Sequence, residues 1–156
     1  MARIMNHPVE YNGITFDSRE ECEYYKFITD NDDFCCIHRQ VRFRLLPRQS
    51  VNVVKHLKTK DKLVEQFLEN PIDYTADFVY YWHDRLVICD VKSAYTHKFR
   101  EWAIIRKLIV KRILEQNKKR HHGVFKVIFR EAIVKVLPKK LGGGISVKNN
   151  DKPSAE

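Results

Sequence analysis

Two apolar segments separated by a short polar break predict a β-hairpin in the middle of the chain. The first segment covers residues 74–82 and the second covers residues 86–92. Both are rich in β-branched and aromatic residues, which is typical of strands. The break is long enough for a tight turn of two residues at 83–84, and this turn pairs Trp82 with Arg85.

The same register places two acidic residues directly opposite each other. Counting back from the turn, Asp77 faces Asp90 across the two strands, and directly opposed carboxylates about 5 Å apart repel. Because side chains alternate between the faces of a strand, Lys92 shares the face of Asp90. We therefore expect a positive group near the two carboxylates.

A helix is predicted before this hairpin, and it carries a third acidic candidate. Ser18 is a good N-cap, and Glu21 follows at the spacing of a capping box. The apolar stripe of this helix, which extends to about Thr29, has Glu21 near its middle. A buried carboxylate is unfavourable unless it is bound. Either Glu21 bonds back to the Ser18 amide, or it belongs to a binding site.

The rest of the pattern completes an α/β fold. Residues 37–46 alternate as a strand, residues 97–117 have the apolar spacing of a long helix, and residues 124–136 are typical of a final strand or hairpin. Residues 63–70 have helical spacing, but an extended conformation fits them nearly as well. We expect a mixed sheet of four or five strands with both helices packed on it.

Length and composition indicate one folded domain. The chain has 156 residues, of which 44% are hydrophobic and 31% charged, and this composition is typical of a soluble globular protein. We assign the domain to residues 1–137 and predict a disordered tail at residues 138–156, which has three consecutive glycines and a polar end. No apolar run is long enough to span a membrane and no signal-peptide pattern is visible, so we expect an intracellular protein.

The four cysteines give little evidence for a metal site. Cys35 and Cys36 lie close to His38, but no second half of a zinc site follows at the usual spacing. We expect these thiols to be reduced and buried, and Cys89 to belong to the core because its strand is apolar.

The three carboxylates and the lysine form a candidate site for a hard cation and a phosphate. Mg²⁺ prefers oxygen ligands and is commonly held by one or two carboxylates together with waters and substrate phosphate. Such an ion polarises a phosphoryl oxygen and lowers the pKa of a bound water. Lys92 is suited to stabilise charge that develops on the phosphate. In the alternative interpretation, Lys92 only neutralises Asp77 or Asp90 in a surface pair of little energetic value.

This constellation resembles the PD-(D/E)XK nuclease superfamily. Asp77 corresponds to the aspartate of the second core strand, and Glu21 to the glutamate of the preceding helix. Asp90-Val91-Lys92 corresponds to the (D/E)-x-K element. The chain is also similar to small phage-encoded nucleases, to junction-resolving endonucleases of the endonuclease I type and to the catalytic domain of a transposon end-cleaving subunit. The segments that carry this similarity are residues 11–18, 40–43, 74–78 and 90–92.

The resemblance implies a restriction-endonuclease-like core and an enzyme that hydrolyses DNA phosphodiester bonds with Mg²⁺, for which Mn²⁺ can substitute. The catalytic residues that it implies are Glu21, Asp77, Asp90 and Lys92. The metal ligands that it implies are Asp77, Asp90, Val91 and Glu21. The chain departs from the usual pattern at Ala76, where many members have proline, and at Ser93, where glycine is common. Neither departure removes a ligand.

The resemblance also implies a biological setting. We expect a phage-encoded endonuclease that is cytoplasmic in the host cell and acts on branched or recombining DNA, without a membrane partner. Cutting a junction needs two active sites, which favours a symmetric homodimer. Further partners that this setting implies are phage replication, recombination or packaging proteins.

Basic residues near Lys92 are the predicted DNA contacts. The net charge of +9 favours a polyanionic partner, and contacts to phosphates give salt-dependent affinity with little sequence preference. The predicted nucleic-acid-binding residues are Gln40, Lys98, Arg100, Arg106 and Lys107. Four lysines within residues 55–62 are candidates for a second contact.

Two functions from other classes are alternatives to the nuclease. One is a nucleic-acid-binding module that has the fold without catalysis, and the other is a protein-interaction subunit of a phage DNA-processing complex. The combination of Asp77, Asp90 and Lys92 favours the enzyme.

Overall fold

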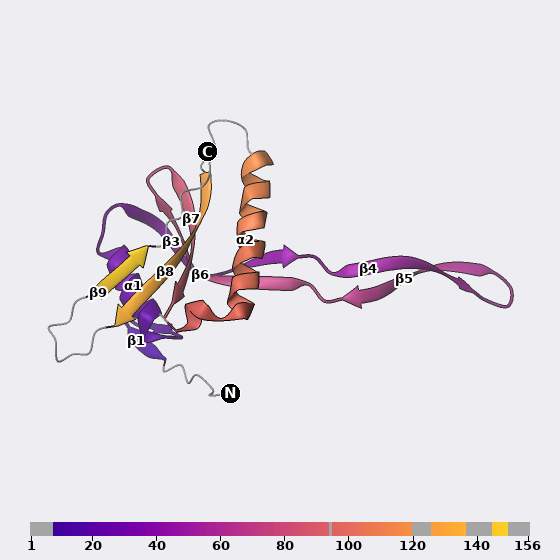
Figure 1. Cartoon of the computed structure of the whole chain (residues 1–156), viewed down its shortest axis with the longest axis horizontal. Helices are drawn as coiled ribbons and strands as arrows, with labels where there is room; N and C mark the ends of the chain where they lie inside the picture. Colours follow the sequence, from indigo (N-terminus) through magenta and orange to yellow (C-terminus); the bar gives the residue numbers. More distant parts are fainter. Residues whose placement is uncertain (1–7, 94, 120–125, 137–144, 150–156) are drawn as a thin grey trace. The chain divides into compact units, whose positions relative to one another are not determined.

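The protein has an α/β structure in a computed structural model, which describes residues 8–93, 95–119, 126–136 and 145–149 (Figure 1). The chain divides into two compact units. The first unit comprises Met1–Val41 and Ala76–Glu156, and the second comprises Arg42–Thr75. Two long strands each contribute residues to both units, namely β3 (Phe34–Leu46) and β6 (Ile72–Trp82).

The first unit begins with a short hairpin and the predicted N-terminal helix. β1 (Val9–Tyr11) pairs with β2 (Ile14–Phe16) across a turn in which Asn12 and Gly13 have positive φ angles of 50° and 72°. Asparagine and glycine tolerate this conformation at little cost. α1 (Arg19–Thr29) follows directly. It begins where the capping box predicted and ends at Thr29, as expected.

The central hairpin has the predicted register. β6 pairs antiparallel with β7 (Arg85–Lys92), and the ladder runs from the pair Trp82–Arg85 to the pair Phe78–Cys89. The next position on each strand is an aspartate. The turn and the alternation of the sequence therefore place the two acidic residues at the same level of adjacent strands.

A helical crossover connects β7 to a parallel neighbour. The chain passes through the short 3₁₀ helix η1 (Thr96–Lys98) and α2 (Arg100–Lys119) into β8 (Lys126–Val136). β8 is parallel to β7 and antiparallel to β9 (Ile145–Asn149). The order β3-β6-β7-β8-β9 is the mixed sheet that we expected. β9 lies within the predicted disordered tail, whose other residues are outside the described part of the chain.

The two helices cover opposite faces of this sheet. On one face α1 and the strands form the buried core, which consists of Phe16, Cys22, Tyr24, Ile28, Phe78, Tyr80, Val87, Cys89, Val91, Ala132 and Val134. On the other face the Trp102 ring of α2 lies 6.3 Å, centroid to centroid, from Phe129 of β8. Because side chains alternate along a strand, Glu131 faces α2 like Phe129. In the described part of the chain, no helix is long and apolar enough to cross a membrane.

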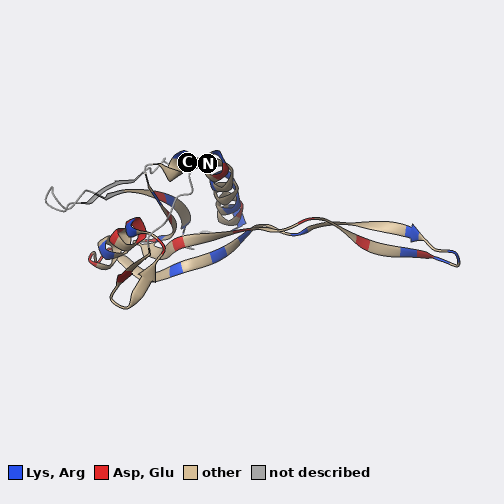
Figure 2. Cartoon of the chain, turned by 90° about the horizontal axis from the view of Figure 1, so that it is seen from below, with Lys and Arg blue, Asp and Glu red and all other residues tan. Residues whose placement is uncertain are grey.

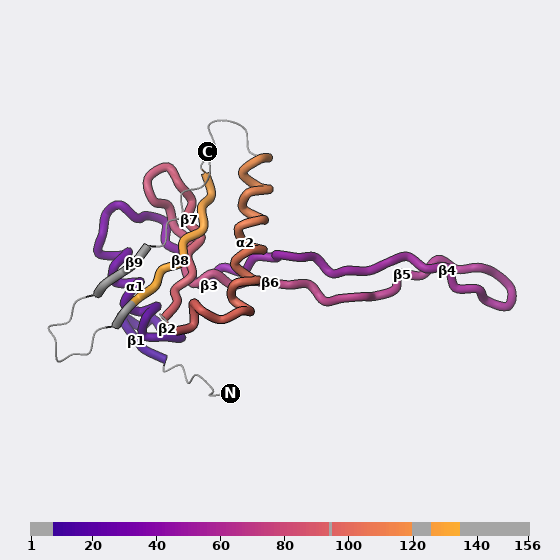
Figure 3. Tube along the Cα trace, in the orientation of Figure 1, coloured from indigo at the N-terminus to yellow at the C-terminus, as the bar shows by residue number. Residues whose placement is uncertain are grey.

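The second unit contains a two-stranded antiparallel ribbon. β4 (Gln49–His56) runs out and β5 (Asp61–Glu69) runs back (Figure 3). In the turn between them the Leu57 N–H donates to the Lys60 carbonyl at 3.0 Å. For residues 63–70 the sequence left helix and strand open, and the strand is adopted because β4 supplies a backbone partner for almost the whole segment.

Candidate active site

Glu21 is held at the start of α1 by the residue that caps the helix. The Ser18 hydroxyl accepts the Glu21 backbone N–H at 3.2 Å and donates to the Glu21 carboxylate at 3.0 Å. In the capping-box alternative the Ser18 backbone amide was the donor, whereas here the hydroxyl bonds the carboxylate. Glu21 is buried. Burial raises the pKa of its carboxyl, while the Ser18 bond and, more weakly, the Lys92 charge oppose this increase.

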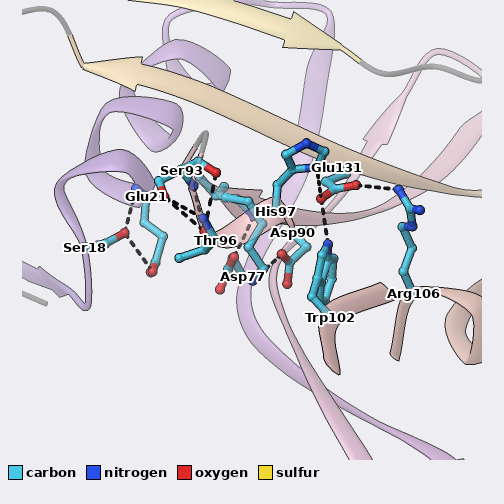
Figure 4. Close-up of polar contacts among 12 residues, drawn as sticks. Ser18, Glu21, Asp77, Asp90, Ser93, Thr96, His97, Trp102, Arg106 and Glu131 are labelled. Carbon is cyan, nitrogen blue, oxygen red and sulfur yellow. Dashed lines mark hydrogen bonds and ion pairs between the residues drawn. The ribbon is translucent and has the colours of Figure 1, made fainter. Parts of the chain in front are cut away.

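Asp77 lies against the end of β7. Its Oδ2 atom accepts the backbone N–H of Val91 at 2.7 Å, so the carboxylate is fixed beside the residue that follows Asp90. Burial first, and then the Glu21 charge, raise the pKa of Asp77 to about 6, although the Val91 N–H and the Lys92 ammonium act in the opposite direction. Glu21 and Lys92 are therefore both close enough to Asp77 to affect its charge, and Figure 4 shows Glu21 and Asp77 in the same part of the site.

Lys92 is fixed by a carboxylate and an aromatic ring. Its Nζ atom lies 2.5 Å from Asp90 Oδ2 and 4.3 Å from the centre of the Trp102 ring. The Asp90 side chain is only 3% exposed and that of Lys92 23% exposed. The alternative interpretation expected Lys92 to neutralise Asp77 or Asp90, and a pair with Asp90 is present. Because the Asp90 side chain is buried, this pair is not an exposed surface pair of the kind that contributes little. A cation over an indole ring is also electrostatically favourable.

Glu131 supports this arrangement and was not singled out in the sequence. It lies next to Asp90 in the parallel register of β7 and β8, and its side chain is 3% exposed. Its carboxylate accepts the Trp102 indole N–H at 2.6 Å and an Arg106 N–H at 3.2 Å, while His97 Nδ1 lies 3.5 Å away (Figure 4). Glu131 thus holds the ring that contacts Lys92.

A sequence signal for Glu131 exists in retrospect. Together with Arg130, the residue interrupts the apolar run of β8, and a charged residue in such a position is seldom buried unless it is paired. The signal does not name the partner, because Glu131 and Asp90 are separated in the chain by the whole α2 crossover. Only the parallel register brings them together.

The predicted DNA contacts fall into two groups. Lys98, Arg100 and Lys107 are exposed on η1 and α2, in the segment that follows Lys92. Arg106 instead donates to the buried Glu131, so part of its charge is used inside the protein.

Gln40 is exposed and has a positive φ angle of 49°. Arg42 and Arg44 follow it at alternate positions of β3 and bind Asp73 within the second unit, at 2.5 and 2.8 Å. These two hydrogen bonds lower the pKa of the Asp73 carboxyl to about 2.

The acidic residues fit a partly hydrated cation. Among the residues that the structure describes, no three His, Cys, Asp or Glu side chains are grouped closely enough to enclose a metal alone. Mg²⁺ does not need such a group, because one or two carboxylates with waters and a substrate phosphate are sufficient. Asp77 and Asp90 offer two carboxylates at the same level of the adjacent strands β6 and β7. The raised pKa of Asp77 marks surroundings in which a cation favours the charged form.

The cysteines do not add to the site. Cys22 and Cys89 are buried, as expected for core thiols, but Cys35 and Cys36 are exposed. The expectation that all four are buried was wrong for this adjacent pair. Cys36 has a positive φ angle of 53°, which interrupts the alternation of β3 where the pair lies.

Comparison with known proteins identifies a family. Residues 1–130 match the family described as protein of unknown function (DUF1064). No curated protein and no solved structure matches the chain significantly. Because the match covers most of the sequence, the protein belongs to the DUF1064 family.

Proposed function

We propose that this protein is a metal-dependent DNA endonuclease with a restriction-endonuclease-like core of the PD-(D/E)XK type. The observation that carries the proposal is the convergence of Glu21, Asp77 and the Asp90–Lys92 pair at one end of the hairpin. A buried carboxylate with a raised pKa next to a second carboxylate and a lysine is more typical of a reactive site than of a structural ion pair.

Asp77 and Asp90 are the residues that would hold Mg²⁺, with the Val91 backbone and Glu21 completing its surroundings. The ion supplies a polarised phosphoryl oxygen and a water of lowered pKa. Mn²⁺ suits the same oxygen ligands. Ser18 fixes the Glu21 carboxylate toward this site through its hydroxyl.

Lys92 acts on the phosphate. Its ammonium group has three donors, and Asp90 on one side and the Trp102 ring on the other define its direction. A fixed cation at the scissile group stabilises charge that develops in the transition state without reorganisation at the moment of reaction. Trp102 and Glu131 are positioning residues, because they act through Lys92.

The basic surface supports DNA as the substrate. Lys98 and Arg100 come shortly after the end of β7, Lys107 lies further along α2, and all three are exposed and available to contact phosphates. The proposed biological role is the processing of branched or recombining phage DNA in the host cytoplasm. A symmetric homodimer would supply the two active sites that junction cutting requires.

A cleavage assay with one substitution tests the proposal. We expect Mg²⁺-dependent nicking of a four-way junction, a linear duplex or single-stranded DNA, and Lys92→Ala should lower the rate by at least about 10²-fold because one preorganised charge is lost. Lys118→Ala is the matched control, since Lys118 is an exposed lysine at the far end of α2. The substrate that is cut fastest identifies the role.

The alternatives give different results in the same assay. Tight DNA binding without cleavage under Mg²⁺ or Mn²⁺ would replace the enzyme with a nucleic-acid-binding module. Weak DNA binding without cleavage would favour a protein-interaction subunit. Equal cleavage by wild type and Lys92→Ala would reject the assigned site even if the protein is a nuclease.

A further inference from the structure

The β4–β5 ribbon has two faces of different charge. In an antiparallel register, residues directly opposite each other lie on the same face. One face, called the lysine face below, carries the pairs Val51–Gln66, Val53–Val64 and Lys55–Lys62. The other face carries the pairs Asn52–Glu65, Val54–Leu63 and His56–Asp61.

The lysine face ends in an unfavourable pair. Lys55 and Lys62 are directly opposite each other, and both are exposed. Like charges in this position destabilise an antiparallel pair. The turn adds Lys58 and Lys60, so four lysines lie between residues 55 and 62 (Figure 2).

In the described part of the chain, the acidic residues of the ribbon form no ion pair with these lysines. His56 Nδ1 lies 2.7 Å from Asp61 Oδ1, and this pair belongs to the other face. Glu65, also on the other face, accepts a hydrogen bond from the Ser50 hydroxyl. None of the three pairs on the lysine face contains a carboxylate. A polyanion would therefore relieve the repulsion between Lys55 and Lys62.

The positive charge of the lysine face favours DNA over a second copy of the chain as its partner. A second copy of the chain would bring another set of lysines against the first, which repel at short range. A DNA backbone presents closely spaced phosphates, and a two-stranded ribbon is narrow enough to enter the major groove of a duplex. Of the exposed apolar side chains of the ribbon, Val54 and Leu63 lie on the opposite face, whereas Val51 lies on the lysine face, two pairs away from Lys55 and Lys62.

We infer that the lysine face of the ribbon binds the phosphate backbone of duplex DNA and forms a second contact separate from the catalytic site. The inference rests on the proposed function in that DNA is taken as the substrate. Lysine contacts to phosphates carry no base information. The ribbon therefore adds affinity and orientation without sequence preference.

The test is the salt dependence of binding to a fluorescein-labelled linear duplex in EDTA, which prevents metal-dependent cleavage. The variant Lys55→Ser/Lys62→Ser should raise Kd about tenfold at about 100 mM KCl. The slope of the logarithm of the association constant against the logarithm of the salt concentration should become shallower by about 2, since each lost phosphate contact contributes about 0.9. Lys55→Arg/Lys62→Arg should keep the wild-type slope.

The matched control removes the same net charge elsewhere. Lys118 and Lys126 are exposed at the end of α2 and the start of β8, at the opposite end of β8 from the level of Lys92. Lys118→Ser/Lys126→Ser should change the slope by much less. Equal losses for the two double variants would overturn the inference, because affinity would then follow net charge alone. An unchanged slope for the ribbon variant would overturn it as well.

A charge reversal separates binding from ribbon stability. Lys62→Glu gives Lys55 an opposite charge across the ribbon, which should slow hydrogen exchange of the amides in residues 49–69. The same variant should bind the duplex at least about tenfold more weakly. Weaker binding together with faster exchange would assign the effect to lost structure and reject the inference.

The two proposals can fail independently. Ribbon-dependent binding by a protein that never cleaves DNA would reject the nuclease and keep the ribbon contact. Cleavage that depends on Lys92, with unchanged binding and KM in Lys55→Ser/Lys62→Ser, would keep the nuclease and reject the contact. A salt-insensitive change of oligomeric state in the ribbon variants would assign the face to a second copy of the chain and reject DNA as its partner.

Discussion

Replacing Asp77 with asparagine should stabilise the metal-free protein. The pKa of Asp77 is raised from an ordinary value of 3.8 to about 6, first by burial and then by the Glu21 charge. One pKa unit corresponds to about 1.36 kcal/mol. The charged form of Asp77 therefore lowers the free energy of unfolding by up to about 3 kcal/mol, compared with the neutral form. Asparagine is neutral at every pH and keeps an oxygen that can accept the Val91 N–H.

The sign of the pH dependence follows from proton binding. Between about pH 4 and pH 6 the folded protein holds a proton on Asp77 more tightly than the unfolded chain, so Asp77 makes the wild type less stable as the pH rises. Below about pH 4 the carboxyl is neutral in both states, and wild type and Asp77→Asn should be similar. Above about pH 6 the variant should be more stable by up to about 3 kcal/mol.

Urea denaturation in EDTA at pH 4, 6 and 8 measures this difference. The chain has two tryptophans, Trp82 and Trp102, and both belong to the unit that contains the site, so their fluorescence reports on its unfolding. Asp84→Asn is the matched control, since Asp84 is in the exposed hairpin turn and its substitution should stay within about 0.5 kcal/mol. A stability gap for Asp77→Asn that is independent of pH, or negative at pH 8, would refute the reasoning.

Added Mg²⁺ should reverse the comparison. A ligand that binds only the folded state stabilises it in proportion to the logarithm of its concentration above Kd. We therefore expect millimolar Mg²⁺ to raise the stability of the wild type and to have little effect on Asp77→Asn. The same effect on both proteins would show that Asp77 is not a ligand.

Three further substitutions test the surroundings of the site. Ser18→Ala should lower the unfolding free energy by about 1 kcal/mol by removing the α1 cap, whereas Ser18→Thr, which keeps the hydroxyl, should stay close to wild type in urea denaturation. Asp90→Asn should cost about 1–3 kcal/mol in the same assay, because it weakens the partner of Lys92; a gain in stability would contradict the pairing. Trp102→Phe should lower the unfolding free energy by about 1–3 kcal/mol, since the buried Glu131 loses its indole donor. It should nevertheless cleave DNA faster than Trp102→Leu, because leucine also removes the aromatic ring that contacts Lys92. Equal cleavage rates for the two Trp102 variants would remove the ring from the positioning of Lys92.

The sequence by itself determined the features that depend on neighbours along the chain. The alternation in the central hairpin and its short polar break predicted the Trp82–Arg85 pair, which the structure has. The spacing of Ser18 and Glu21 predicted the start of α1 for the same reason. In these cases the interacting groups are only a few residues apart, so little loop-closure entropy opposes their contact and local pattern decides it.

Only the tertiary structure decided the features that the local pattern left open and the contacts between strands that are distant in sequence. Residues 63–70 fit both a helical and an extended period, and pairing with β4 selected the strand. Exposed Cys35 and Cys36 follow a backbone irregularity that composition does not reveal. Glu131 reaches Trp102 and the level of Asp90 through a parallel register set across a helical crossover. No turn fixes such a register, because parallel strands are joined by a long connection, and the packing of α2 on the sheet has to select it.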